Sequence, residues 1–467
     1  MKFKFENLGP IYKGEIELTD LTVLCGKNNT GKTYITNSIY SFFKNWSDLL
    51  DWDLPEKFEN DLLQKGIATI DLEEEIVGNL NEIRARAISH LAKKLPDFFA
   101  CSPDLFKDVC FQIDFNVLSN WIGKEFNARI NSPTGDTFLT IKKPENSTFA
   151  EVAWIEVDSN PPIFLLTELI EKHLLHACLG TTFPEVFIAS AERTGSAIFK
   201  NELNFNKNQL VNLLTEMEKN GSKKINPFDI ARSFKRTYAQ SVEHNVDFIS
   251  YRIESLVKKG QSDFIKKNQD LLVKFQEIAG GVYKFHKDMG VYFQPNGSKG
   301  IKLGLGEASS AVRSLMIIWF WLNHVAEENS LLMIDEPELN LHPENQRKLA
   351  QFVTALVNAR VKVFMTTHSD YIIRELNTLV MLSCDKSHIS SVREKFKYNQ
   401  NDFIKPESIA VYNTTEDLFT LEGSSRRKKM GTIERWDVVE NFGIKIQSFD
   451  DEIREMNKIQ DALRYGM

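Results

Sequence analysis

A glycine-rich loop near the N-terminus contains the residue types that bind nucleotide phosphates. The segment GKNNTGKT has the pattern G-x-x-x-x-G-K-[ST]. Its residues are Gly26, Lys27, Asn28, Asn29, Thr30, Gly31, Lys32 and Thr33. In such a loop the backbone N–H groups turn inward toward phosphate oxygens, and the following helix adds its positive N-terminus. We expect Lys32 to reach the β- and γ-phosphates and Thr33 to bind Mg²⁺ through its hydroxyl.

A second segment ends an apolar run with two carboxylates. The run LLMI at 331–334 is followed by Asp335, Glu336 and Pro337. A buried strand would deliver Asp335 to a sheet edge, where it can hold Mg²⁺ directly or through water, and would place Glu336 to polarise an attacking water. A strand that ends in a solvated acidic turn is the plainer reading. We favour the catalytic reading because a phosphate loop requires such a strand and one is present.

A histidine follows the next apolar segment. VKVFMTT at 361–367 leads into His368. A neutral imidazole there can hydrogen-bond the γ-phosphate and report whether it is present. An isolated histidine is more often a surface or capping residue, but its place after the acidic segment favours the phosphate contact. Arg193, in SAERTG, is placed either to reach a phosphate or to form a structural salt bridge.

The elements around these motifs predict an α/β protein. LTVLC at 21–25 is an apolar run that ends at the glycine loop, and residues 33–43 have helical spacing. EVFIA at 185–189 predicts another core strand, and SLMIIWFWLNHV suits a buried helix.

We divide the chain into core and insertions by these patterns. The divisions are an ATPase core at 1–43, 181–199 and 296–385; an insertion at 44–180, helical with some strands; a helical Lys-rich insertion at 200–295; and a C-terminal tail at 386–467 packed on the core.

The order of the motifs resembles that of the ABC-type ATPases. EPELNLHPENQ and TTHSDYI resemble the RecF/SMC/OLD-like branch, which includes ATPases of bacterial anti-phage systems such as PARIS and Septu. The resemblance covers about residues 1–40, 185–195 and 300–380. It implies an ABC-type ATPase head, a P-loop mixed sheet flanked by helices with mostly helical insertions, that takes ATP and Mg²⁺.

The resemblance also implies that ATP binds between two copies of the head, giving a homodimer or a higher homo-oligomer. The partner copy would present a signature segment, here GEASSAVR at 306–313, with Ser309 and Ser310 on the γ-phosphate. This segment has serines where the family's LSGGQ-like pattern has a glycine pair, so a plain capped helix is the alternative. Asn340 and His342 match the segment that lies along the dimer interface in the family.

Composition limits the class of protein. The net charge is −7 and the five cysteines form no CxxC pair, which favours reduced thiols in the cytoplasm. No secretory signal is visible, and no apolar run of about 18 residues appears, so we expect a soluble protein without a membrane segment.

The insertion at 200–290 has the opposite charge to the whole chain. It carries 16 Lys and Arg against 11 Asp and Glu. It can therefore contact a DNA backbone, although Lys-rich helical faces are usually just solvated. Neither insertion sustains the heptads of a long coiled coil. The acidic cluster at 450–452 lies on a predicted helix, so we find no nuclease site in the tail.

Four functions compete for these motifs. The first is an ATP-driven switch that controls a separate effector protein, as in two-gene anti-phage systems, because the chain shows no second catalytic constellation. The second is a RecF-like DNA repair or recombination ATPase that acts directly on DNA. A transporter ATPase subunit is disfavoured by the large insertions, and a small-molecule kinase does not explain His368 or the signature-like segment.

Overall fold

A computed structural model describes residues 1–132, 135–155, 162–203, 236–298, 300–420, 426–440, 442–445 and 448–465. The chain divides into two compact units. The smaller unit comprises Met1–Phe3, Ser41–Leu95 and Cys110–Glu185, and the larger unit comprises Lys4–Tyr40, Pro96–Val109 and Val186–Met467.

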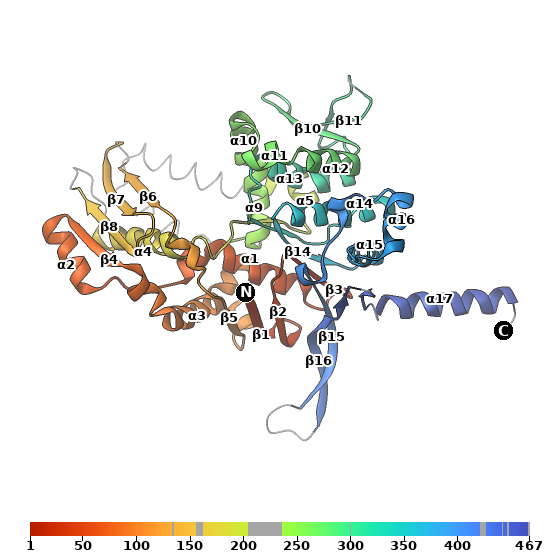
Figure 1. Ribbon diagram of the computed structural model, residues 1–467, viewed down its shortest axis with the longest axis horizontal. Coiled ribbons are helices and arrows are strands. Elements are labelled where there is room, and N and C mark those ends of the chain that lie inside the picture. The colour runs from red at the N-terminus through yellow and green to blue at the C-terminus, as the bar shows by residue number, and fades with distance from the viewer. Residues whose placement is uncertain are drawn as a thin grey trace. The chain divides into compact units, whose positions relative to one another are not determined.

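The larger unit is built on a mixed sheet with the strand order β1-β2-β16-β15-β3-β14-β13-β9 (Figure 1). The strands are β1 (Lys2–Leu8), β2 (Ile11–Glu17), β3 (Leu21–Gly26), β9 (Val186–Ala189), β13 (Leu331–Ile334), β14 (Lys362–Thr367), β15 (Ile409–Thr420) and β16 (Arg427–Trp436). The run from β15 through β3, β14 and β13 to β9 is parallel, and β16 pairs antiparallel with β15.

The central strands are apolar because helices cover the parallel sheet. Residues 21–25 of β3 and all four residues of β13 are buried. A parallel strand buried on both faces is expected to be a continuous apolar run, which is the pattern seen in LTVLC and LLMI. The predicted α/β class, a mixed sheet flanked by helices, is confirmed.

The described helices of the larger unit are α1 (Lys32–Leu49, up to Tyr40 in this unit), α5 (Arg193–Ile198), α6 (Lys200–Leu203), α9 (Gln240–Asp247), α10 (Ile253–Lys259), α11 (Asp263–Lys267), α12 (Gln269–Ala279), α13 (Ser310–His324), α14 (Pro343–Asn358), α15 (Asp370–Met381), α16 (Ser387–Phe396) and α17 (Ser448–Tyr465). Buried residues of α5 and of α10 to α16 form one apolar core with the sheet, whereas the described side chains of α17 are exposed. Phe275 of α12 packs edge-on against Phe352 of α14, with ring centroids 5.0 Å apart. The apolar segment expected to be a buried helix is α13, whose residues from Ser314 to Asn323 are all buried. Among the described residues, no helix is long and apolar enough to cross a membrane.

Smaller sheets complete the larger unit. They are β10 (Gly281–His286), β11 (Gly290–Pro295) and β12 (Leu303–Gly304), and the pair β17 (Val438–Val439) and β18 (Gly443–Ile444). The Lys-rich segment at 200–295 is therefore helical up to Ala279 in its described part and then forms two strands. Its stretch at 204–235 lies outside the described residues.

The C-terminal tail contributes to the sheet itself. We expected it to pack on the core, but β15 inserts between β3 and β16 and so lies beside the strand that leads into the glycine loop. Residues Ile409–Thr414 are all buried, and they form a parallel ladder with residues 21–26. The sequence IAVYNT was too short an apolar run to indicate which strand it would join.

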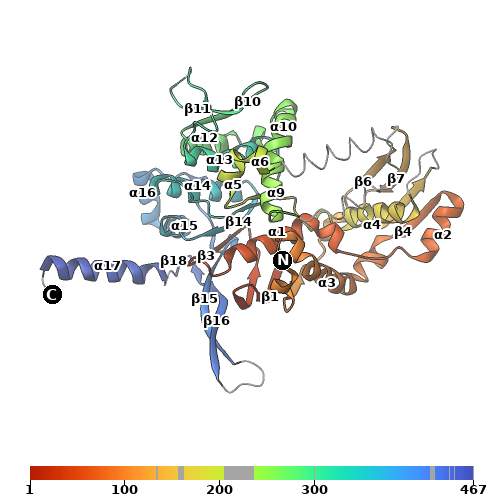
Figure 2. The same cartoon turned by 180° about the vertical axis from the view of Figure 1, so that it is seen from behind.

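The smaller unit has a separate antiparallel sheet with the order β4-β8-β7-β6. Its elements are α2 (Glu56–Lys65), β4 (Ile67–Asp71), α3 (Leu80–Phe98), β5 (Cys110–Asp114), β6 (Phe126–Asn131), β7 (Thr137–Lys143), β8 (Phe149–Trp154) and α4 (Ile163–Leu179). Helix α4 packs on β7, and α2 packs on β4 and β8. Seen from behind, α4 lies against this sheet (Figure 2). The segment at 44–180, which we predicted to be helical with some strands, contains both helices and strands.

Candidate nucleotide-binding site

The topology brings the three predicted motifs to one edge of the larger sheet. In the parallel register Cys25 lies opposite Thr367, and Met365 lies opposite Ile334. The glycine loop, Asp335 and His368 each follow the carboxyl end of one of these adjacent strands. In open α/β sheets, ligands bind outside this edge.

The glycine loop has a backbone shape that requires its glycines. Gly26 and Gly31 have positive φ values of 142° and 97°, and Asn29 has a φ of 61°. A Cβ at Gly26 would lie 1.9 Å from Oγ1 of Thr414, which is too close for any side chain. Thr414 of β15 holds the loop through a hydrogen bond between its hydroxyl and that of Thr30, at 2.6 Å. These contacts hold the loop in the curled shape that a phosphate cradle requires.

Lys32 lies at the start of α1 and points back into the loop. Its Nζ donates to the carbonyl oxygens of Gly26 at 2.9 Å and Lys27 at 2.7 Å. Burial lowers the pKa of Lys32, and the nearby carboxylates of Glu336 and Asp335 partly offset that effect. The neighbouring Thr33 is exposed. The ammonium group therefore lies inside the curl of the loop, where the sequence predicts a phosphate.

Asp335 is a buried carboxylate held by one hydroxyl. It is 3% exposed and accepts a short hydrogen bond from the Thr366 hydroxyl. Burial raises the pKa of Asp335 to about 6, although the Thr366 hydrogen bond opposes this shift. The raised pKa means that burial makes ionisation of Asp335 unfavourable. A nearby cation would stabilise the charged carboxylate.

The side chains present suit Mg²⁺ that arrives with a nucleotide. Among the described residues, no cluster of three or more His, Cys, Asp or Glu side chains is arranged to hold a metal ion by itself. Magnesium commonly uses one or two protein oxygens and completes its shell with phosphates and water. Thr33 and Asp335 offer that kind of donor set.

Glu336 has a strained backbone that its neighbours hold in place. Its φ is 50°, in the left-handed region that disfavours residues with a side chain. Its N–H donates to the Thr366 hydroxyl at 3.0 Å, and its carbonyl accepts from the Arg193 guanidinium at 2.8 Å. Strain of this kind costs about 1–3 kcal/mol and is found where surrounding structure enforces it, often at functional sites.

Arg193 is a structural residue, and it does not form the carboxylate salt bridge that was one of its two expected roles. It is 1% exposed and its guanidinium donates to four backbone carbonyls, those of Ser190, Ser314, Asp335 and Glu336. Burial lowers the pKa of Arg193 to about 10, and the carboxylates around it offset part of this effect. All four bonds go to main-chain atoms, so this side chain shapes the turn that carries the two acidic residues.

His368 lies between two glutamates, one of which the sequence did not reveal. Its Nδ1 is 3.6 Å from Oε1 of Glu336 and 3.4 Å from Oε1 of Glu338. Oε1 of Glu338 also accepts from the backbone N–H of His368 at 2.8 Å. Glu338 is 6% exposed, and its Oε2 has no hydrogen-bond partner. The second glutamate of the EPE segment was the available signal, but its burial could not be read from the sequence.

The serines of the signature-like segment make contacts within their own helix. Oγ of Ser309 accepts from the N–H of Val312 at 3.3 Å and so caps α13, and Oγ of Ser310 accepts from Arg313 at 3.0 Å. Ser309 is exposed. Asn340 has a φ of 63°, and His342 caps α14. The described contacts of Ser309, Ser310 and His342 are thus local ones, made at the starts of α13 and α14.

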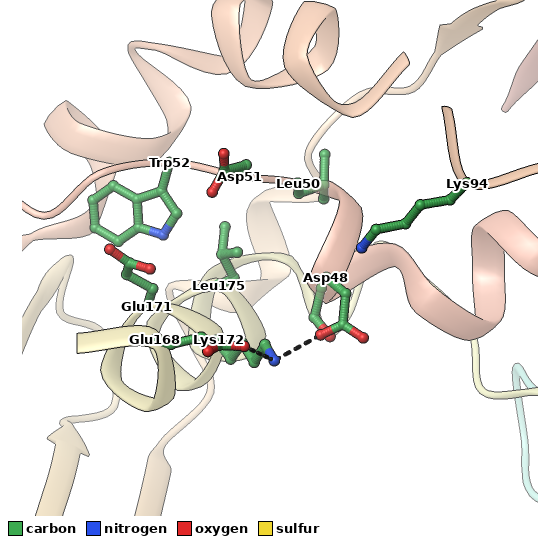
Figure 3. A pocket seen from close by; sticks show the side chains of 10 residues that line it. Asp48, Leu50, Asp51, Trp52, Lys94, Glu168, Glu171, Lys172 and Leu175 are labelled. Carbon is green, nitrogen blue, oxygen red and sulfur yellow. Dashed lines mark hydrogen bonds and ion pairs between the residues drawn. The ribbon is translucent and has the colours of Figure 1, made fainter. Parts of the chain in front are cut away.

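A separate cavity of about 330 Å³ lies in the smaller unit (Figure 3). It is lined by α1, α3 and α4, and Lys172 on α4 bridges Asp48 at 2.8 Å and Glu168 at 2.7 Å. Glu171 faces Trp52 in the same cavity (Figure 3). Its lining contains four carboxylates and two lysines, which disfavours an anionic ligand such as phosphate.

Glu171 gives the smaller unit a pH-dependent stability. Burial raises the pKa of Glu171 to about 7, with help from Asp51 and Asp53, while the Leu54 N–H acts in the opposite direction. A carboxyl with a raised folded-state pKa stabilises the fold below its unfolded pKa and loses that contribution as the pH rises through about 7.

We therefore expect Glu171→Gln to raise the melting temperature more at pH 8 than at pH 5. The gain at pH 8 should be about 1 kcal/mol, discounted because the side chain is only half-buried. Thermal unfolding followed by circular dichroism at both pH values measures it. Glu168→Gln, an exposed carboxylate one turn away, serves as the control and should show no such pH dependence. An equal shift at both pH values would contradict the assignment.

The sequence places the chain in a known family. The family model described as "AAA ATPase domain" (AAA_15) matches residues 1–373, so the chain belongs to that family. No curated protein matches it.

Among solved structures, the chain is similar to three SMC head domains. One is the SMC head bound to the C-terminal winged-helix domain of ScpA, with 9% identity, 93% of this chain and 97% of that chain covered, and a TM-score of 0.33. Another is an SMC head with an extended coiled coil bound to the C-terminal domain of ScpA, from Pyrococcus furiosus (12%, 98% and 98%, 0.31). A third is the SMC head from Thermotoga maritima (10%, 94% and 98%, 0.29). Scores of this size carry no argument about function, and the family assignment rests on the sequence match.

Proposed function

We propose that this chain is an ATP-hydrolysing molecular switch that assembles through its ATP-bound heads. The observation that carries the proposal is the convergence of Lys32, Asp335, Glu336 and His368 at one edge of a parallel sheet. A preformed loop with an ammonium group, beside two carboxylates and an imidazole, can bind a triphosphate and direct water at its last phosphate. The family match, which describes an ATPase domain, supports this reading.

Each side chain has a distinct part in the proposed reaction. Lys32 exchanges the loop carbonyls for β- and γ-phosphate oxygens. Thr33 and Asp335 would hold Mg²⁺, which would neutralise charge on the phosphates. Glu336 orients the attacking water and accepts its proton, while His368 donates a hydrogen bond to the γ-phosphate.

The proposed assembly depends on Ser309 and Ser310, which in this proposal contact a γ-phosphate bound by a second copy of the chain. Ser309 is exposed at the N-terminus of a 15-residue helix, where backbone N–H groups favour an anion. In the proposed dimer, Ser309 and Ser310 of each copy contact the γ-phosphate bound by the other, so that ATP closes the assembly and hydrolysis opens it. The same contact can build a larger oligomer.

The output of the switch is proposed to lie in a separate effector protein. The described residues contain no group of three or more His, Cys, Asp or Glu side chains that could hold the metal ion of a nuclease. We therefore propose that the chain is the sensor or regulatory ATPase of a bacterial anti-phage system. The test is purification with the neighbouring genes of its native operon: a stable complex supports the proposal, and no partner in either ATP-bound or nucleotide-free protein would count against it.

Direct action on DNA through the Lys-rich segment is the weaker alternative. In its described part, Lys258 pairs with Glu254 and Lys266 pairs with Asp263, each at i,i+4 or i,i+3 spacing on its own helix. Such pairs are typical of a solvated helical face. A RecF-like role would require turnover that duplex DNA stimulates and that salt suppresses.

Substitution of Glu338 tests whether this side chain positions His368. We expect Glu338→Ala to lower kcat by about 10- to 100-fold with little change in KM, the range found when an outer partner of a site residue is removed. The reason is that the turn carrying His368 loses its N–H acceptor. Glu338→Gln keeps an acceptor oxygen and should recover most of the loss.

Steady-state turnover against ATP concentration measures this effect. A melting temperature recorded for both variants separates positioning from general unfolding. Equal losses in the alanine and glutamine variants would show that the charge of Glu338, and not its hydrogen bond to the His368 N–H, is what the site requires.

A further inference from the structure

The cavity in the smaller unit has a negatively charged lining that the proposed ATP reaction does not use. Its volume of about 330 Å³ lies at the lower end of the range for small-molecule sites, about 300–1,000 Å³. The charged residues of the lining are Asp48, Asp51, Lys94, Glu168, Glu171 and Lys172. When all of them are ionised, four carboxylates against two ammonium groups leave a net charge of −2. This excess favours a cationic ligand.

The two lysines of the lining are directed at one pair of these carboxylates. Nζ of Lys172 lies 2.8 Å from Asp48 and 2.7 Å from Glu168. Figure 3 shows that the ammonium group of Lys94 also points toward Asp48. The excess negative charge therefore belongs to the other two carboxylates of the lining.

These two carboxylates, Asp51 and Glu171, lack a lysine or arginine partner within the described parts of the chain. Asp51 lies 4.0 Å from Nε2 of His90, which is charged only when it is protonated. Burial raises the pKa of Glu171, and repulsion from Asp51 raises it further. The two carboxyl groups are thus close enough to repel each other, and a cation that pairs with both would relieve the repulsion.

Trp52 adds a buried donor to the same cavity. Its side chain lines the cavity and is 5% exposed, and its Nε1 has no hydrogen-bond partner among the described residues. Figure 3 shows the indole nitrogen on the side of the ring that is turned toward the other lining residues. Because buried N–H groups are normally hydrogen-bonded, this one favours a ligand that carries an acceptor oxygen. The face of a tryptophan ring also attracts a cation.

An organic ammonium group fits these side chains better than a metal ion. Over the described ranges, no three His, Cys, Asp or Glu side chains are arranged to hold a metal. An ammonium group donates up to three hydrogen bonds and has no coordination shell to complete. We propose that the cavity binds a small organic amine, whose ammonium group pairs with Asp51 and Glu171 and whose hydroxyl or carbonyl oxygen accepts a hydrogen bond from Nε1 of Trp52. The proposal goes beyond the ATP switch and does not depend on it, so binding is measured without nucleotide.

The probe is 4-amino-1-butanol, which carries an ammonium group and a hydroxyl. The full chain is labelled with nitrogen-15 in its seven tryptophans, and the indole N–H signals are followed by NMR. The titration is made at pH 8, because a carboxyl with a pKa of about 7 is then mostly charged. Trp52→Phe identifies the Trp52 signal as the one that disappears. We expect the probe to shift this signal and the shift to saturate.

Two compounds with the same carbon chain separate the two recognised groups. Butanediol lacks the ammonium group, and we expect it to bind at least about 10-fold more weakly than the amino alcohol. Butylamine keeps the ammonium group but lacks the hydroxyl, and we expect it to bind about 2- to 10-fold more weakly.

A double variant removes the two charges that the amine would meet. Asp51→Asn/Glu171→Gln should bind the probe at least about 10-fold more weakly than the wild type. It should remain folded because it removes carboxylates that repel each other, and a melting curve checks this. Glu171→Gln alone should also bind the probe more weakly. Asp114→Asn/Glu151→Gln removes two exposed carboxylates of the same unit that do not line the cavity, and it should bind the probe as the wild type does.

The proposal is overturned if the probe leaves the Trp52 signal unshifted, if butanediol binds as tightly as the amino alcohol, or if the Asp51/Glu171 variant binds like the wild type. It is also overturned if magnesium chloride shifts the Trp52 signal with saturation and the amine does not. That result would assign the cavity to a metal ion.

Discussion

Replacing Glu336 with glutamine should leave a protein that binds ATP but hydrolyses it at least about 100-fold more slowly. In the proposed mechanism the carboxylate of Glu336 accepts the proton of the attacking water, and the amide of glutamine cannot do so. The side chain is only 25% exposed, and its backbone is held by Thr366 and Arg193. Because these bonds use main-chain atoms, the substitution should not disturb the turn.

The measurement is phosphate release under saturating ATP together with equilibrium binding of a fluorescent ATP analogue. Glu344→Gln provides a matched control, since Glu344 is an exposed carboxylate on the first turn of α14 that pairs with Lys348 at 2.8 Å. It should hydrolyse ATP at the wild-type rate. Wild-type turnover by the Glu336 variant would show that another group is the base. Because ATP is trapped, this variant should also be the form in which assembly is easiest to detect.

Replacing Arg193 with alanine should destabilise the larger unit by about 3–5 kcal/mol, the range for removing one partner of a buried charged network. The guanidinium is buried and donates to four carbonyls from three separate segments. Its loss removes one donor from each carbonyl; Ser190 and Glu336 keep a backbone donor, from the N–H groups of residue 193 and Leu339, and a carbonyl left without any donor costs about 1–3 kcal/mol where water cannot reach it. The left-handed backbone of Glu336 would also lose one of the bonds that hold it.

Chemical denaturation of the variant and of Arg193→Lys tests this role. Lysine keeps a charge but cannot direct a planar fork at several carbonyls, so we expect an intermediate loss of stability. Arg374→Ala, which removes one surface ion pair with Asp370, should change stability by no more than about 0.5 kcal/mol. Wild-type stability with abolished turnover would instead assign Arg193 to a phosphate contact.

The local motifs were predictable because each follows directly from a strand. GKNNTGKT, LLMIDEPE and VKVFMTTHS all place polar residues after apolar runs, and parallel strands necessarily bring such residues to one edge. This reasoning predicted that Lys32, Asp335 and His368 lie near one another. The apolar run in α13 likewise predicted that this helix is buried.

The supporting contacts were not predictable because they join residues far apart in the chain. Arg193 reaches carbonyls more than 100 residues away, and Thr414 reaches Thr30 across 384 positions. Neither sequence neighbourhood contains a signal for the other. The position of β15 in the sheet was not predictable for the same reason, since a short apolar run does not indicate which strand it pairs with.

The roles of Ser309 and Ser310 belong to a different category. One chain shows them capping and bonding within α13, and a contact with γ-phosphate would require a second copy.

ATP turnover by the wild-type protein and by Lys32→Met, in the presence of Mg²⁺, tests the central claim most directly. The substitution keeps the length of the side chain and removes only the ammonium group that the loop positions. We predict measurable turnover by the wild type and a loss of at least about 100-fold in the variant. Equal turnover by the two proteins, or a wild type that neither binds nor hydrolyses ATP, would contradict the assignment of this site.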